Sequence, residues 1–157
     1  ALEHRIGEAR IGELCGETRI DRVDELADGG RVIIDYKTGS AVSSDWTGER
    51  PDSPQLPLYA LQFAEPVVAL AYGKLSRPNP EFIAAAARAR IFGPTKRNGP
   101  VGLEQAPDLP QALQHWARRL ERLAREYLAG HAMVNPRGGA CTHCELAALC
   151  RIEELSA

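Results

Sequence analysis

Alternating apolar and polar positions, broken by glycine-rich turns, dominate the first quarter of the chain. This pattern predicts a meander of strands over residues 1–37. The turn Asp28-Gly29-Gly30 favours a hairpin between strands expected over 20–26 and 31–37. Residues 38–52 are rich in Thr, Gly, Ser, Asp and Pro, and this composition predicts a loop.

The middle of the chain mixes helix and strand signals. A helix is expected over 53–63 with Ser53 as its N-cap, because the proline that follows suits the first helical position. The apolar run 67–72 predicts a buried strand. The alanines of 82–92 favour a helix, but the place of this segment after a strand favours a hairpin partner, and we expect a strand. Residues 93–107 are rich in Gly and Pro and predict a loop.

The most regular apolar pattern predicts a helix over 108–129 that ends at Gly130. Apolar side chains recur there at spacings of three and four and form one stripe, made of Leu113, Trp116, Leu120, Leu123 and Tyr127. Four arginines lie on other faces of this helix, namely Arg118, Arg119, Arg122 and Arg125. The mixture of strands and helices indicates an α/β fold, and we expect a single domain over 1–157.

Composition is that of a globular protein, with 44% hydrophobic and 25% charged residues among 157. The chain has no apolar run of about 18 residues or more, so no membrane span is expected. The N-terminus lacks a signal-peptide pattern, which favours a cytoplasmic location. A net charge of −2 excludes a protein that coats DNA with basic residues, but it permits an enzyme that grips nucleic acid locally.

Two acids and a lysine stand at the ends of two expected strands. Asp21 follows an apolar residue of the first strand, and Asp35-Tyr36-Lys37 ends the second. Two carboxylates and the backbone carbonyl of Tyr36 are the hard oxygen ligands that Mg²⁺ prefers. Lys37 lies two residues after Asp35, so both side chains point to one face of the strand, where a cation can stabilise a phosphodiester transition state or help to deprotonate water.

The same residues can instead form ordinary surface ion pairs. Asp21 would then pair with Arg19 or Arg22, and Lys37 with a nearby carboxylate. Aspartate and lysine two residues apart are common, so spacing alone favours this alternative. Asp24 is expected to form a salt bridge or a turn rather than to bind a metal.

The runs 20–26 and 33–39 resemble the PD-(D/E)XK nuclease superfamily, and within it the RecB/AddB-type branch. A second block, formed by Trp46, Arg50 and the run 54–59, resembles the segment of this branch in which Gln and Tyr lie on a helix beside the metal site. The resemblance implies a restriction-endonuclease-like fold, a central mixed β-sheet flanked by helices. It also implies that DNA is the substrate.

The resemblance assigns roles to five side chains. It implies that Asp21 and Asp35 bind Mg²⁺ or Mn²⁺ and that Lys37 is the catalytic lysine. It further implies that Gln55 and Tyr59, which share a helix face at a spacing of four, support the site or contact DNA. The alternative for this pair is an ordinary helix cap and a core tyrosine.

Members of the family also carry an acid or a histidine upstream of these strands. Glu3 and His4 are the candidates in this chain, and each is more typical of an ordinary strand residue.

Three cysteines near the end of the chain, in the segment 136–157, are spaced as C-x2-C-x5-C, namely Cys141, Cys144 and Cys150. Soft ligands this close together favour a metal or a cluster over disulfides. In the AddB-like branch this spacing resembles the last three ligands of an iron–sulfur cluster, whose first ligand lies far upstream. Cys15 or His143 is the candidate for the fourth ligand here, His143 in the case of Zn²⁺.

Taken together, these features predict a metal-dependent DNA nuclease domain. The resemblance implies a role in recombination and repair of DNA ends, and we expect the chain to be a fragment of a larger protein that works with a helicase. One alternative is the CRISPR-adaptation exonuclease, which shares the motifs and a cysteine cluster. The other is a nuclease-fold module that binds DNA or acts as a scaffold without catalysis.

Overall fold

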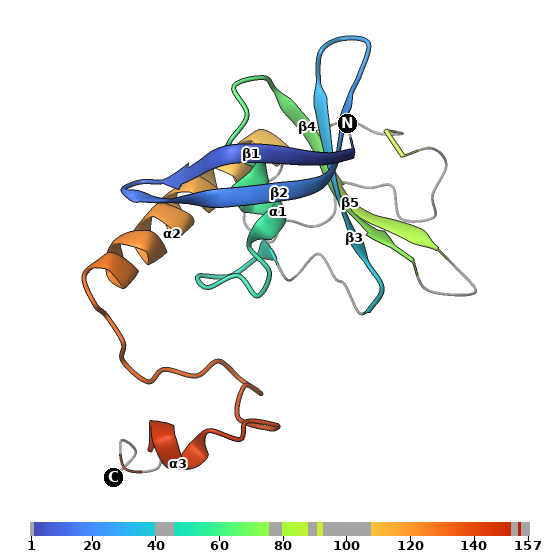
Figure 1. Ribbon diagram of the computed structural model, residues 1–157. Coiled ribbons are helices and arrows are strands. Elements are labelled where there is room, and N and C mark those ends of the chain that lie inside the picture. The colour runs from blue at the N-terminus through green and yellow to red at the C-terminus, as the bar shows by residue number, and fades with distance from the viewer. Residues whose placement is uncertain are drawn as a thin grey trace. The chain divides into compact units, whose positions relative to one another are not determined.

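The computed structural model describes residues 2–39, 46–75, 80–87, 91–92, 108–151 and 154. The strands are β1 Leu2–Ile11, β2 Leu14–Glu25, β3 Arg31–Lys37, β4 Val67–Lys74 and β5 Glu81–Ala86. The helices are α1 Gln55–Ala60, α2 Leu109–Leu128 and α3 Ala147–Cys150 (Figure 1). The chain divides into two compact units, Ala1–Arg125 and Glu126–Ala157, which are described separately.

The five strands form one open mixed sheet in the order β1-β2-β3-β4-β5. The pairs β1–β2, β2–β3 and β4–β5 are antiparallel, whereas β3 and β4 are parallel. Parallel neighbours need a crossover connection, and α1 lies in the segment that makes it. The sheet with its flanking helices confirms the predicted restriction-endonuclease-like fold class.

The predicted hairpin joins β2 to β3 at Asp28-Gly29-Gly30. Gly29 has a φ of 82°, a conformation that favours glycine. The Asp28 carboxylate accepts a hydrogen bond from the Gly30 backbone N–H at 3.2 Å. A side chain at position 30 would meet Val68 at 2.9 Å, so close approach also requires a glycine there. The turn therefore fixes the register that brings Asp21 toward β3.

Helix α1 is shorter than the expected 53–63 and starts differently. Its N-cap residue is Pro54, without a side-chain capping hydrogen bond, so the expectation of a Ser53 cap was wrong. Packing holds this helix instead, because its buried residues are Leu56, Pro57, Tyr59 and Ala60.

The segment after α1 contains both expected strands. The buried strand expected over 67–72 continues to Lys74 in β4, and β5 is its antiparallel hairpin partner. This confirms a strand in the first half of 82–92. The expected loop 93–107 lies outside the described residues.

Helix α2 confirms the most regular pattern in the chain, although its buried line differs from the expected stripe. The buried residues are Leu109, Ala112, Trp116, Leu120 and Ala124. Most of these residues are four apart, whereas one helical turn takes 3.6 residues. Each buried residue is therefore displaced slightly around the helix axis relative to the one before it. Tyr127 lies outside this buried line and is 72% exposed. The predicted stop is correct, because Gly130 has a φ of 73° and donates to the Tyr127 carbonyl at 3.0 Å.

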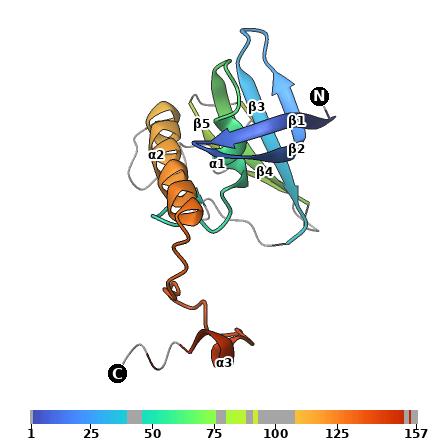
Figure 2. The same cartoon turned by 60° about the vertical axis from the view of Figure 1, so that its left-hand side comes forward.

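The main core lies between α1, α2 and one face of the sheet, and in both views the two helices lie on that side (Figures 1 and 2). Successive side chains of β3 point to opposite faces. Ile33 belongs to the helix-side core, whereas Val32 and Ile34 pack on the other face. Asp35 therefore points to the same side as Ile33, toward the helices. None of the helices in the described part of the chain is long and apolar enough to cross a membrane.

Candidate active site

Asp21 and Asp35 lie on neighbouring strands, Asp35 near the end of β3 but Asp21 inside β2 rather than at the strand end that the sequence led us to expect. Strands β2 and β3 pair Arg22 with Ile34 and Val23 with Ile33. Continued by one residue, this register places Asp21 opposite Asp35. The Asp21 carboxylate takes the place of a backbone partner there, because Oδ2 accepts a hydrogen bond from the Tyr36 backbone N–H at 2.8 Å.

Asp35 is a buried carboxylate, only 6% exposed, in the middle of the sheet. Its buried Oδ2 lies 2.8 Å from the Lys37 ammonium, in an ion pair. Burial raises the pKa of Asp35 above its usual range, and the interaction with Lys37 offsets only part of this effect. The negative charge of Asp21 raises the pKa further. The ionised form of Asp35 is therefore disfavoured unless a further positive charge lies beside it.

Lys37 is oriented by three groups. Besides the ion pair with Asp35, its Nζ donates a hydrogen bond to Oε1 of Gln55 at 3.1 Å. The ammonium also lies 5.6 Å from the centre of the Tyr72 ring, within reach of a cation–π interaction. Burial alone would lower the pKa of Lys37, but the hydrogen bond and charge of Asp35 outweigh it and the pKa is raised. Lys37 is thus held as a cation.

The backbone of Tyr36 points its polar groups toward Asp21. Its N–H donates to Asp21, whereas the next carbonyl, that of Lys37, accepts from Leu75 beyond β4. The N–H and C=O of one strand residue share an edge, so the Tyr36 carbonyl also points to the Asp21 side. The Tyr36 ring packs against Gly73, where a Cβ would lie 2.6 Å from the ring.

These groups fit a divalent cation such as Mg²⁺. Asp35 offers a buried carboxylate beside the Lys37 ammonium, the charge of Asp21 lies close enough to affect it, and the Tyr36 carbonyl points to the Asp21 side. Mg²⁺ is usually bound by one or two carboxylates, with water and phosphate supplying the rest. Among the residues that the structure describes, no three His, Cys, Asp or Glu side chains form a group that could hold a metal ion.

A comparison with models of protein families shows which family the chain belongs to. The PD-(D/E)XK nuclease superfamily matches residues 8–151. The chain belongs to this superfamily. Neither the curated proteins nor the solved structures gave a match to the chain. PD-(D/E)XK proteins are generally nucleases that use Mg²⁺ or Mn²⁺, and the match covers both acids, the lysine and α1.

The residues of the second sequence block lie in two different places, some at the candidate site and others in the main core. Gln55 contacts Lys37, whereas Tyr59 is 5% exposed and packs in the main core. The environment of Tyr59 is therefore the one expected if it were an ordinary core tyrosine. Trp46 is also buried, and its carbonyl accepts a hydrogen bond from the Trp116 indole at 2.8 Å. Catalytic roles for Gln55 and Tyr59 stay predictions.

Other candidates are placed as follows. Asp24 forms a salt bridge with Arg22 at 2.7 Å, as expected, and so Arg22 is engaged away from Asp21. Glu3 and His4 lie on β1, whose Leu2 end pairs with Arg22. Their role as an upstream ligand stays a prediction.

Sequence analysis missed Tyr72, which forms the floor beneath Lys37. Tyr72 pairs with Asp35 across the parallel strands β3 and β4, and it also packs against Trp46 at 4.9 Å between ring centres. Lys74 is the register partner of Lys37, two residues further along the strands, and pairs with Glu81 at 3.5 Å. Only the parallel register brings these residues to the site, and no local motif marks them.

The cysteine segment belongs to the second unit. The three clustered cysteines and Cys15 are all described, and none forms a disulfide. The Leu146 N–H donates to the sulfur of Cys144 at 3.4 Å. Cys15 lies on the exposed β1–β2 hairpin, paired with Arg10. Among the described residues no three-ligand centre forms, so the iron–sulfur cluster stays a prediction from the sequence.

Proposed function

We propose that this chain is the nuclease domain of a DNA-processing enzyme that hydrolyses phosphodiester bonds with Mg²⁺ or Mn²⁺. The observation that carries the proposal is the linked set Asp35–Lys37–Gln55, with Asp21 opposite Asp35. A buried acid, an oriented ammonium and a second acid at one strand end meet the needs of phosphate chemistry. Surface ion pairs would not require the burial of Asp35.

Each residue has a separate task in this mechanism. Asp21 and Asp35, with the Tyr36 carbonyl, would hold the metal ion, which when bound neutralises phosphate charge and activates water. Asp21 is kept in place by the Tyr36 N–H, and Asp35 by burial in the sheet. These two acids would therefore hold the cation beside β3.

Lys37 acts by charge and hydrogen bonding. Its ion pair with Asp35 keeps the ammonium protonated, and Gln55 fixes its direction. It would donate to an oxygen of the scissile phosphate as negative charge develops in the transition state. The raised pKa disfavours the alternative in which neutral Lys37 removes a proton from water.

The finer assignment follows the sequence resemblance. We infer a role in processing DNA ends during recombination or repair, beside a helicase, with Cys141, Cys144 and Cys150 binding an iron–sulfur cluster. Visible absorbance and iron analysis of anaerobically purified protein test the cluster, and a colourless, iron-free protein would remove it. A CRISPR-adaptation exonuclease remains the second enzyme hypothesis, and the genomic neighbourhood distinguishes the two.

The deciding experiment is a cleavage assay on single- and double-stranded DNA with Mg²⁺, Mn²⁺ or EDTA. We expect metal-dependent cleavage by the wild type and a loss of at least about 100-fold in Asp35→Asn and in Lys37→Ala, the scale of removing one preorganised catalytic group. Asp24→Asn is the matched control, because Asp24 pairs with Arg22 and should keep its activity. Unchanged cleavage in both site variants refutes the assignment. DNA binding without cleavage or metal binding would instead support the scaffold alternative.

A further inference from the structure

Helix α2 carries a groove that the proposed chemistry does not use. Its volume is about 460 Å³, and four arginines line it, namely Arg118, Arg119, Arg122 and Arg125. All four belong to the first compact unit, Ala1–Arg125. We call this feature the arginine groove.

The charge of the arginine groove is positive, although the whole chain carries −2. Two carboxylates, Glu49 and Glu121, line it together with the four guanidinium groups. A local excess of arginine on a slightly acidic protein concentrates positive potential on one surface. Guanidinium groups bind phosphate oxygens through paired N–H donors, so phosphate is the chemistry that this surface suits.

The carboxylate of Glu49 already occupies part of the groove. Oε2 of Glu49 lies 2.8 Å from Arg122, and Oε1 lies 3.4 Å from Arg119. Arg122 also donates to the Glu49 backbone carbonyl at 2.9 Å. These contacts show that the groove can hold an oxyanion, and they leave Arg118 and Arg125 as exposed cations on the same helix.

Arg118 and Arg125 stand two helical turns apart, about 10 Å along the axis at 1.5 Å per residue. That length matches the rise of about three nucleotides in one strand of B-form DNA. A single free phosphate would need only one or two of these guanidinium groups. A run of phosphates along one strand can use the whole helix face.

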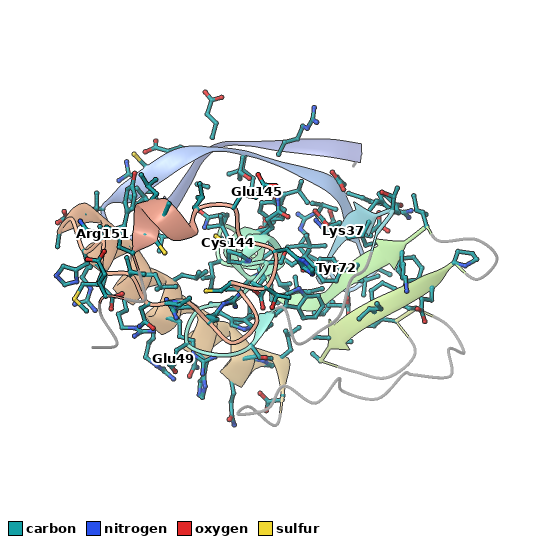
Figure 3. All side chains as sticks on the ribbon, turned by 90° about the horizontal axis from the view of Figure 1, so that it is seen from below. Lys37, Glu49, Tyr72, Cys144, Glu145 and Arg151 are labelled. Carbon is teal, nitrogen blue, oxygen red and sulfur yellow. The ribbon has the colours of Figure 1, made fainter. Side chains whose placement is uncertain are left out.

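The groove is joined to the candidate active site through the segment between β3 and α1. Glu49 lies in this segment, which begins after Lys37 and leads to Gln55. Figure 3 shows Glu49 on the α2 side and Lys37 at the sheet, so the two places are separate. A strand held in the groove would therefore be contacted outside the place where the bond is cut.

We propose that the arginine groove binds the backbone phosphates of the nucleic-acid substrate, outside the catalytic site. This inference rests on the proposed function for the identity of the ligand. Contacts of this kind set affinity and register, but they do not read sequence.

The test is binding of a fluorescent oligo-dT by the Asp35→Asn protein in EDTA, measured by anisotropy over a series of salt concentrations. The Asp35→Asn background prevents cleavage. Adding Arg118→Gln and Arg125→Gln should lower affinity roughly 10-fold and reduce the salt slope by about 1.4, since each lost phosphate contact removes about 0.7 on single strands. Neither arginine holds Glu49 in the ion pairs described above, so the loop contacts stay intact.

Two matched variants sharpen the result. Glu121→Gln removes a negative charge from the groove and should raise affinity. Arg10→Gln removes an equally exposed arginine from the β1–β2 hairpin, where Arg10 pairs with Glu8, and should leave affinity and salt slope unchanged. If Arg10→Gln weakened binding equally, the loss of affinity would reflect net charge and not the arginine groove, and the inference would be overturned.

The failure of this inference can be told apart from failure of the proposed function. If the wild type cleaves DNA but the groove variants bind with unchanged affinity and salt slope, the groove has another role and the inference falls alone. If an acidic peptide binds the protein and loses affinity in the groove variants while oligo-dT does not bind, the surface serves a protein partner and the inference is also overturned. Absence of any cleavage by the wild type would count against the proposed function only.

Discussion

The ammonium of Lys37 lies 2.8 Å from Oδ2 of Asp35, and yet this ion pair does not restore the usual pKa of the buried acid. Burial and the neighbouring charge of Asp21 both raise the pKa of Asp35. Without a metal, the ionised site therefore works against folding. A bound divalent cation would remove that conflict, which links stability, pH and metal in the predictions below.

Asp35→Asn should raise the melting temperature in EDTA at neutral pH. A carboxyl whose folded pKa is raised binds its proton more tightly in the folded state, so wild-type stability falls as pH rises through the window above the usual Asp pKa. The advantage of Asp35→Asn should appear across that window, persist at neutral pH and vanish in acid below about pH 3.9. Thermal melts from about pH 3 to pH 8 measure it. A lower melting temperature than wild type at pH 7 would contradict the burial argument.

Divalent metal should stabilise the wild type through the two acids. Saturation at about 100 times the dissociation constant adds about 2.7 kcal/mol to the free energy of unfolding. Thermal shift with Mn²⁺ should therefore show a clear rise for wild type and Asp24→Asn, and little or none for Asp21→Asn or Asp35→Asn. A full shift in Asp21→Asn would remove this residue from the metal site.

Gln55→Ala should lower the rate of cleavage without changing metal binding. The substitution removes the acceptor that holds Lys37 Nζ at 3.1 Å, a hydrogen bond to a charged group worth about 1.5–3 kcal/mol. Because Gln55 is exposed, we expect the lower end, roughly a 10-fold loss in kcat. Single-turnover cleavage and Mn²⁺ titration separate the two effects. Loss of metal binding in this variant would show that Gln55 acts on the acids rather than on the lysine.

Gly73→Ala should destabilise the fold and weaken metal binding together. Its Cβ would lie 2.6 Å from Cδ1 of the Tyr36 ring, and moving Tyr36 also moves the backbone that holds Asp21. Overpacking of this kind costs about 1–3 kcal/mol. Gly16→Ala is the control, since nothing lies within 4 Å of its added Cβ. Denaturant unfolding and metal titration of both variants measure the changes in stability and in metal affinity. Equal effects at both positions would refute the packing explanation.

Trp116→Phe should loosen the segment that carries Gln55. The indole N–H donates to the buried Trp46 carbonyl at 2.8 Å, and phenylalanine leaves this acceptor without its donor at a cost of about 1–3 kcal/mol. Hydrogen exchange should rise in residues 46–54 more than in β3. Leu123→Ala, on the same helix but outside the buried line, serves as the comparison. Uniform exchange across both regions would show only a general loss of stability.

Local sequence patterns predicted most of the helices and strands, but fewer of the residues at which they begin and end. The hairpin at Asp28-Gly29-Gly30 and the stop at Gly130 depend on backbone conformations that glycine favours, so the sequence is sufficient to place them. The start of α1 could not be predicted in this way, because burial of Leu56 and Tyr59 replaces the expected cap. Tyr127 was misplaced because a small change in helical spacing moves the last turn out of the buried line.

The sequence by itself singled out the acids, the lysine and the glutamine through their resemblance to the family's motifs, and the two-residue period of a strand put Asp35 and Lys37 on one face. Only the tertiary structure decided that Asp35 is buried, that Gln55 rather than Tyr59 contacts Lys37, and that Tyr72 lies beneath it. These facts depend on which strands pair and in which register. The parallel pairing of β3 with β4 joins residues more than thirty positions apart, and no local pattern encodes that contact.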